Sequence, residues 1–481
     1  MQQTQNPWMK QRYAAVCWDF YRYHQMQMPS DVHDTYCQAL IDTIEGDYES
    51  HPVCTVVHIR RVFSLSNNNN LPAVKSTIRN FVIRHGQDDM APGLWGVELD
   101  LIIANRKKFT EQEKAVVVNE HEARLLRLNA STQPSIEFTI KEQATLLADY
   151  YKADATPDNR KRVLMVMENA FRQSFNVKNA MQQMACLQLL SYIYTTYQLH
   201  SEAKRLYADI QQASLQVPAQ MQTVQATHQL TPEEVNAFQT LITQMTSGDF
   251  ATQLNLFKNR FTPQISEIDK LVQRYAANSI LNLVATTQMM DEKGRPMSVL
   301  GTVEDDYAGN LAYYASMHYH IDAQTLRSVI ERHTTNGLFD TNFFVGKVSS
   351  SPYFQSNRID LIRHALDLYF SQDYITFCHL IVPQIEDAIR NIVESNGYAV
   401  IKQQPKGNKG YQLRTLDELL NEQVITDKFS ADGAFYLRTV LTNQKSYNIR
   451  NMLCHGIANP NNFGVVAADR LLHILYLVTT I

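Results

Sequence analysis

The chain has 481 residues, of which 44 are Lys or Arg and 48 are Asp or Glu, giving a formal net charge of -4. This near balance excludes attraction of the whole molecule to nucleic acid, so any such binding has to use a local patch. Glycine and proline number only 16 and 15, which favours helices over a turn-rich all-β fold.

The sequence shows no targeting or membrane signal. No apolar run approaches the length of a membrane-spanning helix, and residues 1–16 lack the apolar core of a signal peptide. The cysteines are scattered without a Cys-x-x-Cys pair, as expected of free thiols in a reducing compartment. We therefore expect a cytoplasmic protein that makes no membrane contact.

The first half of the chain is predicted to be largely helical. Residues 1–134 are mixed or helical, and the run HPVCTVVHIRRVFSL (51–65) is β-branched enough for a strand. Residues 135–284 are predicted to form helical hairpins, similar to an α-solenoid but without a strict repeat. Three apolar helix faces support this: Leu164, Met167, Ala170 and Phe171; Leu187, Leu190, Tyr194 and Tyr197; Ala203, Leu206, Tyr207 and Ile210.

The second half of the chain changes in composition and in predicted structure at two places. The stretch TPEEV (231–235) predicts a helix start with a capping box. Residues 285–354 are rich in turn residues and are predicted to be an irregular connecting region, either a small insert or irregular helices. Residues 355–481 are predicted to be a helical bundle, with a break between two long helices at Ser371–Asp373 and a helix end at Gly397. The predicted fold class is mainly α.

The segment SYNIRNMLCHGIANPNN, near the end of the chain, concentrates polar side chains. Asn451 and His455 are four positions apart and share one face of a helix. Arg450 converges on them if the helix begins at Asn448, a candidate N-cap, and Gly456 is a candidate C-cap. The pattern predicts a short, bounded helix that carries three convergent polar groups.

These groups suit RNA cleavage by attack of the ribose 2′-hydroxyl on its own phosphate. Histidine titrates near neutrality and can move the protons. Arginine is always charged and suits the phosphorane oxygens, while asparagine can position the phosphate or hold the histidine. The reaction needs no metal, and the sequence has no His, Cys or carboxylate cluster at ligand spacing.

A structural role is the competing interpretation, because arginine and histidine near a helix end often act only as caps or ion-pair partners. The stretch IRNFVIRHG repeats the pattern with Arg79, Asn80, His85 and Gly86, but without the flanking helical pattern. We name this stretch the upstream echo and predict that it is a surface feature.

Residues 355–481 resemble a bacterial family of domains of unknown function marked by an RNxxxHG signature, itself similar to the HEPN (higher eukaryotes and prokaryotes nucleotide-binding) superfamily. The matching stretches are LIRHALDLYFSQDYITFCHLIVPQIEDAIRNIV, TLDELL and NIRNMLCHGI, in which Arg450, Asn451 and His455 occupy the signature. The resemblance implies a HEPN-like bundle acting as a metal-independent endoribonuclease, a toxin or antiviral-defence effector. It also implies RNA as substrate, a homodimer, no cofactor, and control by an inhibitor or trigger protein. Ile457 stands where some HEPN toxins carry a tyrosine that a partner antitoxin adenylylates, so this route of neutralisation is not expected.

The same resemblance points to His379, Glu386 and Arg390, whose spacings of seven and four put them on one helix face. It implies that Glu386 orients Arg450 or His455 from a neighbouring helix. The alternative is a simple ion pair between Glu386 and Arg390, with His379 as a packing residue.

A basic loop, IKQQPKGNKGYQLR, follows this helix and suits RNA phosphates and base stacking. Its candidate RNA-binding residues are Lys402, Lys406, Lys409, Tyr411 and Arg414. The alternative is a solvated loop without a partner. His318 and His320 lack a third ligand at suitable spacing, so no metal site is expected there.

The rival interpretation for the whole chain is a non-catalytic RNA- or protein-binding helical module with a degenerate HEPN-like bundle. A module that only binds has no need for His455, so the intact pair of Arg450 and His455 favours the nuclease. The N-terminal helical region, which lies outside the resemblance, is expected to sense a trigger or to hold the nuclease in check.

Overall fold

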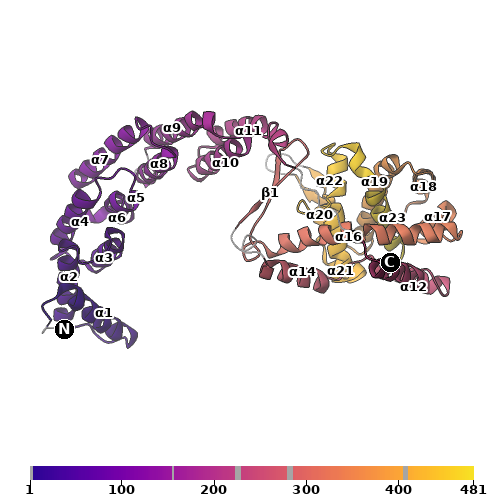
Figure 1. The fold of residues 1–481 in the computed structure, drawn as a ribbon, viewed down its shortest axis with the longest axis horizontal. Coiled ribbons are helices and arrows are strands. Elements are labelled where there is room, and N and C mark those ends of the chain that lie inside the picture. The colour runs from indigo at the N-terminus through magenta and orange to yellow at the C-terminus, as the bar shows by residue number, and fades with distance from the viewer. Residues whose placement is uncertain (1–3, 154–155, 223–228, 279–284, 405–409) are drawn as a thin grey trace. The chain divides into compact units, whose positions relative to one another are not determined.

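The structure is a computed structural model (Figure 1), and the residues it describes are 4–153, 156–222, 229–278, 285–404 and 410–481. The described residues are helical apart from two short hairpins and the connections, which confirms the mainly α fold class. The chain divides into two compact units, Met1–Ala213 and Ser214–Ile481. The sequence analysis instead placed boundaries after residues 134, 284 and 354.

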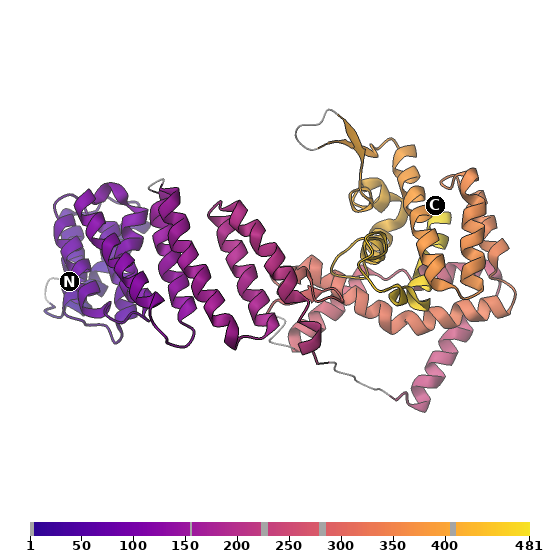
Figure 2. The same cartoon turned by 90° about the horizontal axis from the view of Figure 1, so that it is seen from above.

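The N-terminal unit is a row of helices in which neighbours in the sequence pack on one another, as the purple and magenta ribbons show (Figure 2). Its elements are α1 (Pro7–Tyr23), α2 (Ser30–Glu45), α3 (Pro52–Leu65), α4 (Leu71–His85), α5 (Pro92–Trp95), α6 (Val97–Ala104), η1 (Arg106–Lys108), α7 (Glu111–Asn129), α8 (Ile136–Ala153), α9 (Pro157–Gln173), η2 (Ser174–Val177), α10 (Ala180–Thr196) and α11 (His200–Ser214). The contacts α1–α2, α8–α9 and α7–α8 are among the most extensive in this unit.

The strand considered for residues 51–65 is wrong, because this run forms α3. His51 caps the helix by accepting a hydrogen bond from the Val53 amide (3.2 Å), and Pro52 fits the first turn. Ile59, Val62 and Phe63 are buried on one face. Burial at helical spacing thus outweighs the β-propensity of the branched residues.

The predicted apolar faces of α9, α10 and α11 are buried, with one exception. Tyr207 is 58% exposed, whereas Ala203, Leu206 and Ile210 on the same helix are buried. Tyr207 lies at the edge of the buried stripe, so α11 covers a narrower surface than predicted.

The second unit has one hydrophobic core running from α12 to α23. Its elements are η3 (Pro218–Gln220), α12 (Pro232–Met245), α13 (Phe250–Arg260), α14 (Ile265–Asn278), β1 (Thr287–Met290), β2 (Pro296–Leu300), α16 (Tyr307–Thr335), α17 (Thr341–Ser350), η4 (Ser356–Arg358), α18 (Ile359–Phe370), α19 (Tyr374–Ser395), β3 (Ile401–Gln403), β4 (Tyr411–Leu413), α20 (Leu416–Leu420), α21 (Gln423–Leu441), α22 (Ile449–Cys454), η5 (Pro460–Phe463) and α23 (Val465–Thr479). Helix α23 packs on α16, α17 and α19. Strands β1–β2 and β3–β4 form antiparallel pairs.

Residues 285–354 differ most from the sequence expectation. They form the β1–β2 hairpin, α16 and α17, and α16 is a single helix of 29 residues that is capped by the Asp306 side chain. Some of the predicted turn residues lie in the hairpin turn and in the connections around α16, whereas Gly346, Ser349 and Ser350 lie within α17. Elsewhere the local predictions hold: Thr231 begins α12 with a capping box, and Gly397 follows α19 with φ +84°. None of the helices in the described ranges combines the length and apolarity needed to cross a bilayer.

Candidate functional site

The RNxxxHG segment folds as α22, a helix of six residues with abrupt ends. Asn448 precedes it in the left-handed conformation (φ 51°, ψ 31°). At the other end the Gly456 amide donates to the Leu453 carbonyl and the Ile457 amide donates to the Met452 carbonyl. This pair of bonds defines a Schellman cap, which needs a left-handed residue at Gly456 (φ +60°).

Asn451 is fixed by hydrogen bonds on both sides of its amide. Its Nδ2 donates to Asn448 Oδ1 (2.8 Å) and to the Thr442 carbonyl (3.2 Å), while its Oδ1 accepts from Arg450 Nη1 (3.1 Å). Asn448 stands at the predicted N-cap position, but its side chain makes no capping hydrogen bond and holds Asn451 instead. Asn451 links the end of α21 to the motif arginine.

Glu386 of α19 holds Arg450 through two hydrogen bonds. Arg450 Nε donates to Oε2 (2.9 Å) and Nη2 donates to Oε1 (3.4 Å). The hydrogen bond with Glu386 raises the pKa of Arg450, and the two side chains are only 21% and 17% exposed. Together with Asn451, the described residues engage three of the five guanidinium N–H groups, which leaves one on each Nη for an anionic ligand.

His455 ends α22 and is exposed. Its backbone amide donates to the Asn451 carbonyl (3.1 Å), whereas its ring has no hydrogen-bond partner among the described residues. Because the side chain is exposed, a substrate can reach the ring. The motif thus combines a fixed arginine with an open histidine.

The neighbouring face of α19 contains both interactions that the sequence left open. Glu386 Oε1 also accepts from Arg390 Nη2 (3.2 Å), so the carboxylate bridges Arg390 and Arg450. Arg390 Nη1 in turn donates to the Arg414 carbonyl (3.2 Å), just after β4. A continuous chain of hydrogen bonds therefore runs from the β3–β4 hairpin to the motif.

His379 lies apart from this chain of hydrogen bonds. Its Nδ1 contacts the Ile375 carbonyl one turn earlier (2.8 Å), and its ring meets Phe463 edge-on at 5.6 Å. Phe463 belongs to η5, which follows the motif in the sequence. His379 is thus positioned to pack against the segment after His455, and its ring makes no bond to Glu386.

The candidate RNA-binding residues are spread over the β3–β4 hairpin. Lys402 donates to Glu418 (2.6 Å), and this hydrogen bond lowers the pKa of Glu418 to about 2. Arg414 pairs with Glu422 and donates to the Ala399 carbonyl (2.8 Å). Both cations are thereby engaged by the fold itself.

Tyr411 has a different environment, since its side chain is 71% exposed on β4. It stands opposite Gln403 in the hairpin register, and an exposed aromatic ring of this kind suits base stacking. Lys406 and Lys409 lie outside the described residues.

Cys454 is a neighbour of the motif that the sequence analysis missed. It stands four residues after Arg450, so the two side chains share a helix face. Partial burial raises the pKa of this thiol, while Arg450 lowers it and Glu386 raises it. The thiol is therefore protonated at neutral pH, and its i, i+4 spacing is the signal that places it beside Arg450.

The upstream echo lies on α4, where carboxylates engage its charged groups. Arg79 donates to Glu98 (3.0 Å) and Glu120 (2.7 Å), and His85 contacts Asp47 (2.9 Å). His85 is the last residue of α4, a helix of 15 residues, and the Gly86 that follows it is not left-handed as Gly456 is.

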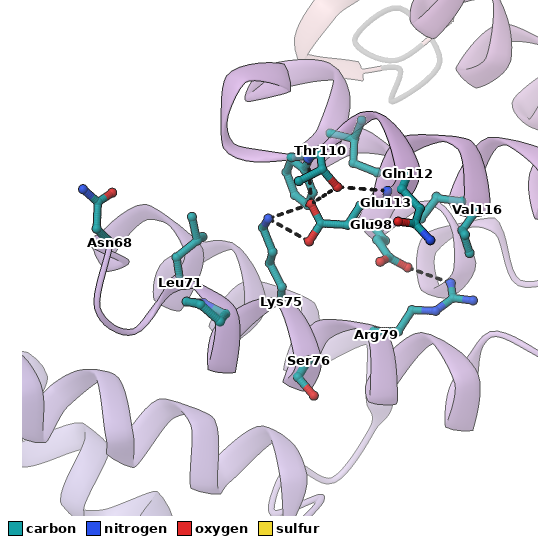
Figure 3. A pocket seen from close by; sticks show the side chains of 14 residues that line it. Asn68, Leu71, Lys75, Ser76, Arg79, Glu98, Thr110, Gln112, Glu113 and Val116 are labelled. Atoms are coloured by element: carbon teal, nitrogen blue, oxygen red, sulfur yellow. Dashed lines mark hydrogen bonds and ion pairs between the residues drawn. The ribbon is translucent and has the colours of Figure 1, made fainter.

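Arg79 also lines a cavity of about 610 Å³ in the N-terminal unit (Figure 3). Figure 3 shows Lys75 reaching Glu113 and Arg79 reaching Glu98 along its wall. Burial raises the pKa of Glu98, against the lowering effect of Arg79. Each of these cations has a carboxylate partner, which identifies a structural cluster of ion pairs.

His318 and His320 lie within α16 and do not form part of a ligand set. Burial lowers the pKa of both, and the His320 ring packs at 4.9 Å from Tyr447. Over the part of the chain that the structure describes, no group of three or more His, Cys, Asp or Glu side chains is placed to hold a metal ion.

Comparisons with known proteins give no match: no family model, no curated protein and no solved structure is significantly similar to this chain. The function therefore has to be argued from the geometry of the site.

Proposed function

We propose that this chain is a metal-independent endoribonuclease whose site is α22 and the residue that ends it. The observation that carries the proposal is the contrast between two side chains five residues apart. Glu386 and Asn451 fix Arg450 so that two N–H groups remain, while the ring of His455 is exposed and has no described partner. A fixed cation beside an open acid–base group suits phosphoryl transfer.

The roles follow from these environments. Arg450 binds the non-bridging phosphate oxygens and stabilises the extra negative charge of the phosphorane. His455 takes the proton from the 2′-hydroxyl or delivers one to the leaving 5′-oxygen, a contribution of roughly 10²–10⁴-fold. Asn451 holds the guanidinium in place through its Oδ1.

The resemblance to the RNxxxHG family and the HEPN superfamily supports a pairing of two copies. One histidine performs one proton transfer at a time, whereas a homodimer with two motifs in one cleft supplies an acid and a base together. The N-terminal row of helices, solenoid-like in its neighbour-to-neighbour packing, then senses a trigger or binds an inhibitor protein. A toxin or antiviral-defence effector in the cytoplasm fits this organisation.

One observation favours the alternative, a non-catalytic RNA- or protein-binding module with a degenerate bundle. Glu386 offsets the charge of Arg450, and Lys402 and Arg414 are paired within the hairpin. In such a module the exposed Tyr411 stacks a base while Arg450 only stabilises the fold. Binding without cleavage is its expected behaviour.

The experiment that separates the two incubates the pure protein with total RNA and compares wild type with His455→Ala. A matched control is His364→Ala, which removes another exposed histidine, on α18. The nuclease proposal predicts cleavage by wild type and by His364→Ala but not by His455→Ala. Equal RNA binding by all three proteins without any cleavage supports the binding module.

A further inference from the structure

The β1–β2 hairpin contacts the segment that follows His455. Its turn residue Glu292 accepts a hydrogen bond from the Asn459 amide (3.1 Å) and another from the side-chain amide of Asn462. These partners are 167 and 170 residues away in the sequence. The contact therefore joins two distant parts of the second unit immediately after the motif.

Glu292 is presented by a rigid turn. Asp291 is 8% exposed, and its Oδ1 accepts hydrogen bonds from the amides of Lys293 and Arg295 (both 2.9 Å). Its Oδ2 accepts from Arg295 Nε (2.6 Å), and Gly294 has φ +76°. The side chain of Glu292 thus projects from a backbone that is held on either side of it.

The same turn is also supported on another side. A Cβ added to Gly294 would come within 2.8 Å of Pro218 Cδ and closer still to the Ser214 carbonyl oxygen. Only glycine fits this contact, which places the turn against the first residues of the second unit. The hairpin turn is thus held at residues 214–218 and holds residues 459–462.

The segment after His455 makes few other hydrogen bonds to separate elements, although Phe463 at its end is buried where η5 packs on α19 and α23. Its remaining described hydrogen bonds between Ile457 and Asn462 go to α22 or stay within the segment, such as Asn462 to the Asn459 carbonyl (2.9 Å). Among the described hydrogen bonds of residues 457–462, those to Glu292 are the ones that reach an element other than α22.

We propose that Glu292 is a positioning residue for His455, an inference that rests on the proposed nuclease function. The Schellman cap fixes the backbone on one side of Gly456, and Glu292 fixes the chain from Asn459 onward. His455 lies within the capped turn, and Glu292 restrains the chain that leaves this turn four residues later. A misplacement of about 1 Å at a reacting group costs up to about 100-fold in rate, so loss of the Glu292 contact lowers catalysis without removing a catalytic group.

The test compares Glu292→Ala, Glu292→Gln and the control Glu304→Ala, which removes an equal charge from an exposed turn after β2. Glu292→Ala is expected to lower kcat for RNA cleavage by about 10- to 100-fold, with KM within a few-fold of wild type. Glu292→Gln keeps one acceptor oxygen and is expected to restore part of the rate, while Glu304→Ala behaves as wild type. Asn462→Ala, which removes one donor, is expected to show a smaller loss that does not add to that of Glu292→Ala.

Hydrogen exchange of residues 456–463 provides a readout that does not depend on nuclease activity. Exchange should accelerate in Glu292→Ala and remain unchanged in Glu304→Ala. Unchanged exchange in Glu292→Ala, or wild-type or higher kcat despite faster exchange, overturns the positioning role. An inactive wild type refutes the nuclease proposal and with it the catalytic role, while the exchange result still shows whether Glu292 holds the segment.

Discussion

Arg79 in the N-terminal unit and Arg450 in the second unit both precede an asparagine and, a few residues later, a His-Gly pair. Arg79 meets two carboxylates, and its histidine meets a third. Arg450 meets one carboxylate and an amide oxygen, and the ring of His455 has no described partner. The comparison teaches that the residue pattern alone does not define a site. A site is defined by the side-chain groups of the pattern that the fold leaves free to meet a substrate.

The glycines of the two segments show the same difference in backbone. Gly456 has φ +60° and allows α22 to end at His455. Gly86 has φ -91°, and a Cβ added there would lie 2.6 Å from the Val82 carbonyl oxygen and 3.2 Å from Trp95 Cβ. The first glycine is required by its left-handed conformation and the second by close packing.

The largest expected effect concerns the motif side chains. His455→Ala and Arg450→Ala are each expected to lower RNA cleavage by about 100- to 10,000-fold, because one removes proton transfer and the other removes charge stabilisation. Both variants should fold, since neither side chain belongs to the core, and both should relieve any growth inhibition caused by expression. Calorimetry measures the free energy of unfolding of each variant. A loss of several kcal/mol of stability in either variant would show that the motif has a structural role instead.

Glu386→Ala is expected to lower cleavage by about 10- to 100-fold, since it frees the guanidinium of Arg450 without removing it. Arg390→Ala is the matched comparison, because it removes a partner of Glu386 but leaves the contact with Arg450. Single-turnover kinetics should place its effect well below that of Glu386→Ala. Equal effects of the two variants contradict a direct role of Glu386 in holding Arg450.

In the upstream echo the expected effect is on stability. Arg79→Ala leaves the buried Glu98 without a cation, a cost of about 1–3 kcal/mol at pH 7. Burial already raises the pKa of Glu98, so its contribution to stability is fully present below the unfolded value of 4.5 and is lost as pH rises through the higher folded value. Loss of Arg79 removes a lowering influence on that pKa, so urea denaturation should show a larger deficit at pH 7 than at pH 4. A deficit independent of pH contradicts this origin.

The smallest expected effect is that of the echo on cleavage. The double variant Arg79→Ala with His85→Ala should keep RNA cleavage within a few-fold of wild type, when assayed where its N-terminal unit remains folded. The reason is that both side chains are engaged by carboxylates on neighbouring elements. Cleavage lost by a folded double variant means that the echo takes part in the site.

Local patterns predicted the parts of the fold that local interactions determine. The buried faces of α9 and α10, the capping box at Thr231 and the end of α19 at Gly397 follow from spacing and capping chemistry. The helical state of residues 51–65 did not follow from local patterns, because it depends on burial against neighbouring helices. Residues 307–335, predicted as part of an irregular connection, a small insert or irregular helices, form one long helix for the same reason.

For the candidate site, too, local sequence predicted only part of the geometry. The helix face shared by Glu386 and Arg390 follows from spacing, whereas the contact of Glu386 with Arg450 spans 64 residues and only the family resemblance suggested it. Asn448 looked like a cap but adopts the left-handed conformation, and Glu292 gave no sequence signal at all. Contacts between distant segments depend on the packed core, which no local pattern encodes.

The most direct test of the central claim is cleavage of one RNA oligonucleotide by the full chain in excess EDTA, beside the same oligonucleotide with a single 2′-deoxy sugar at the cut site. The account predicts that the ribose substrate is cut to a 2′,3′-cyclic phosphate or 3′-phosphate end. It predicts that the deoxy substrate resists, because the nucleophile is missing. Cleavage abolished by EDTA, or equal cutting of the deoxy substrate, contradicts the account.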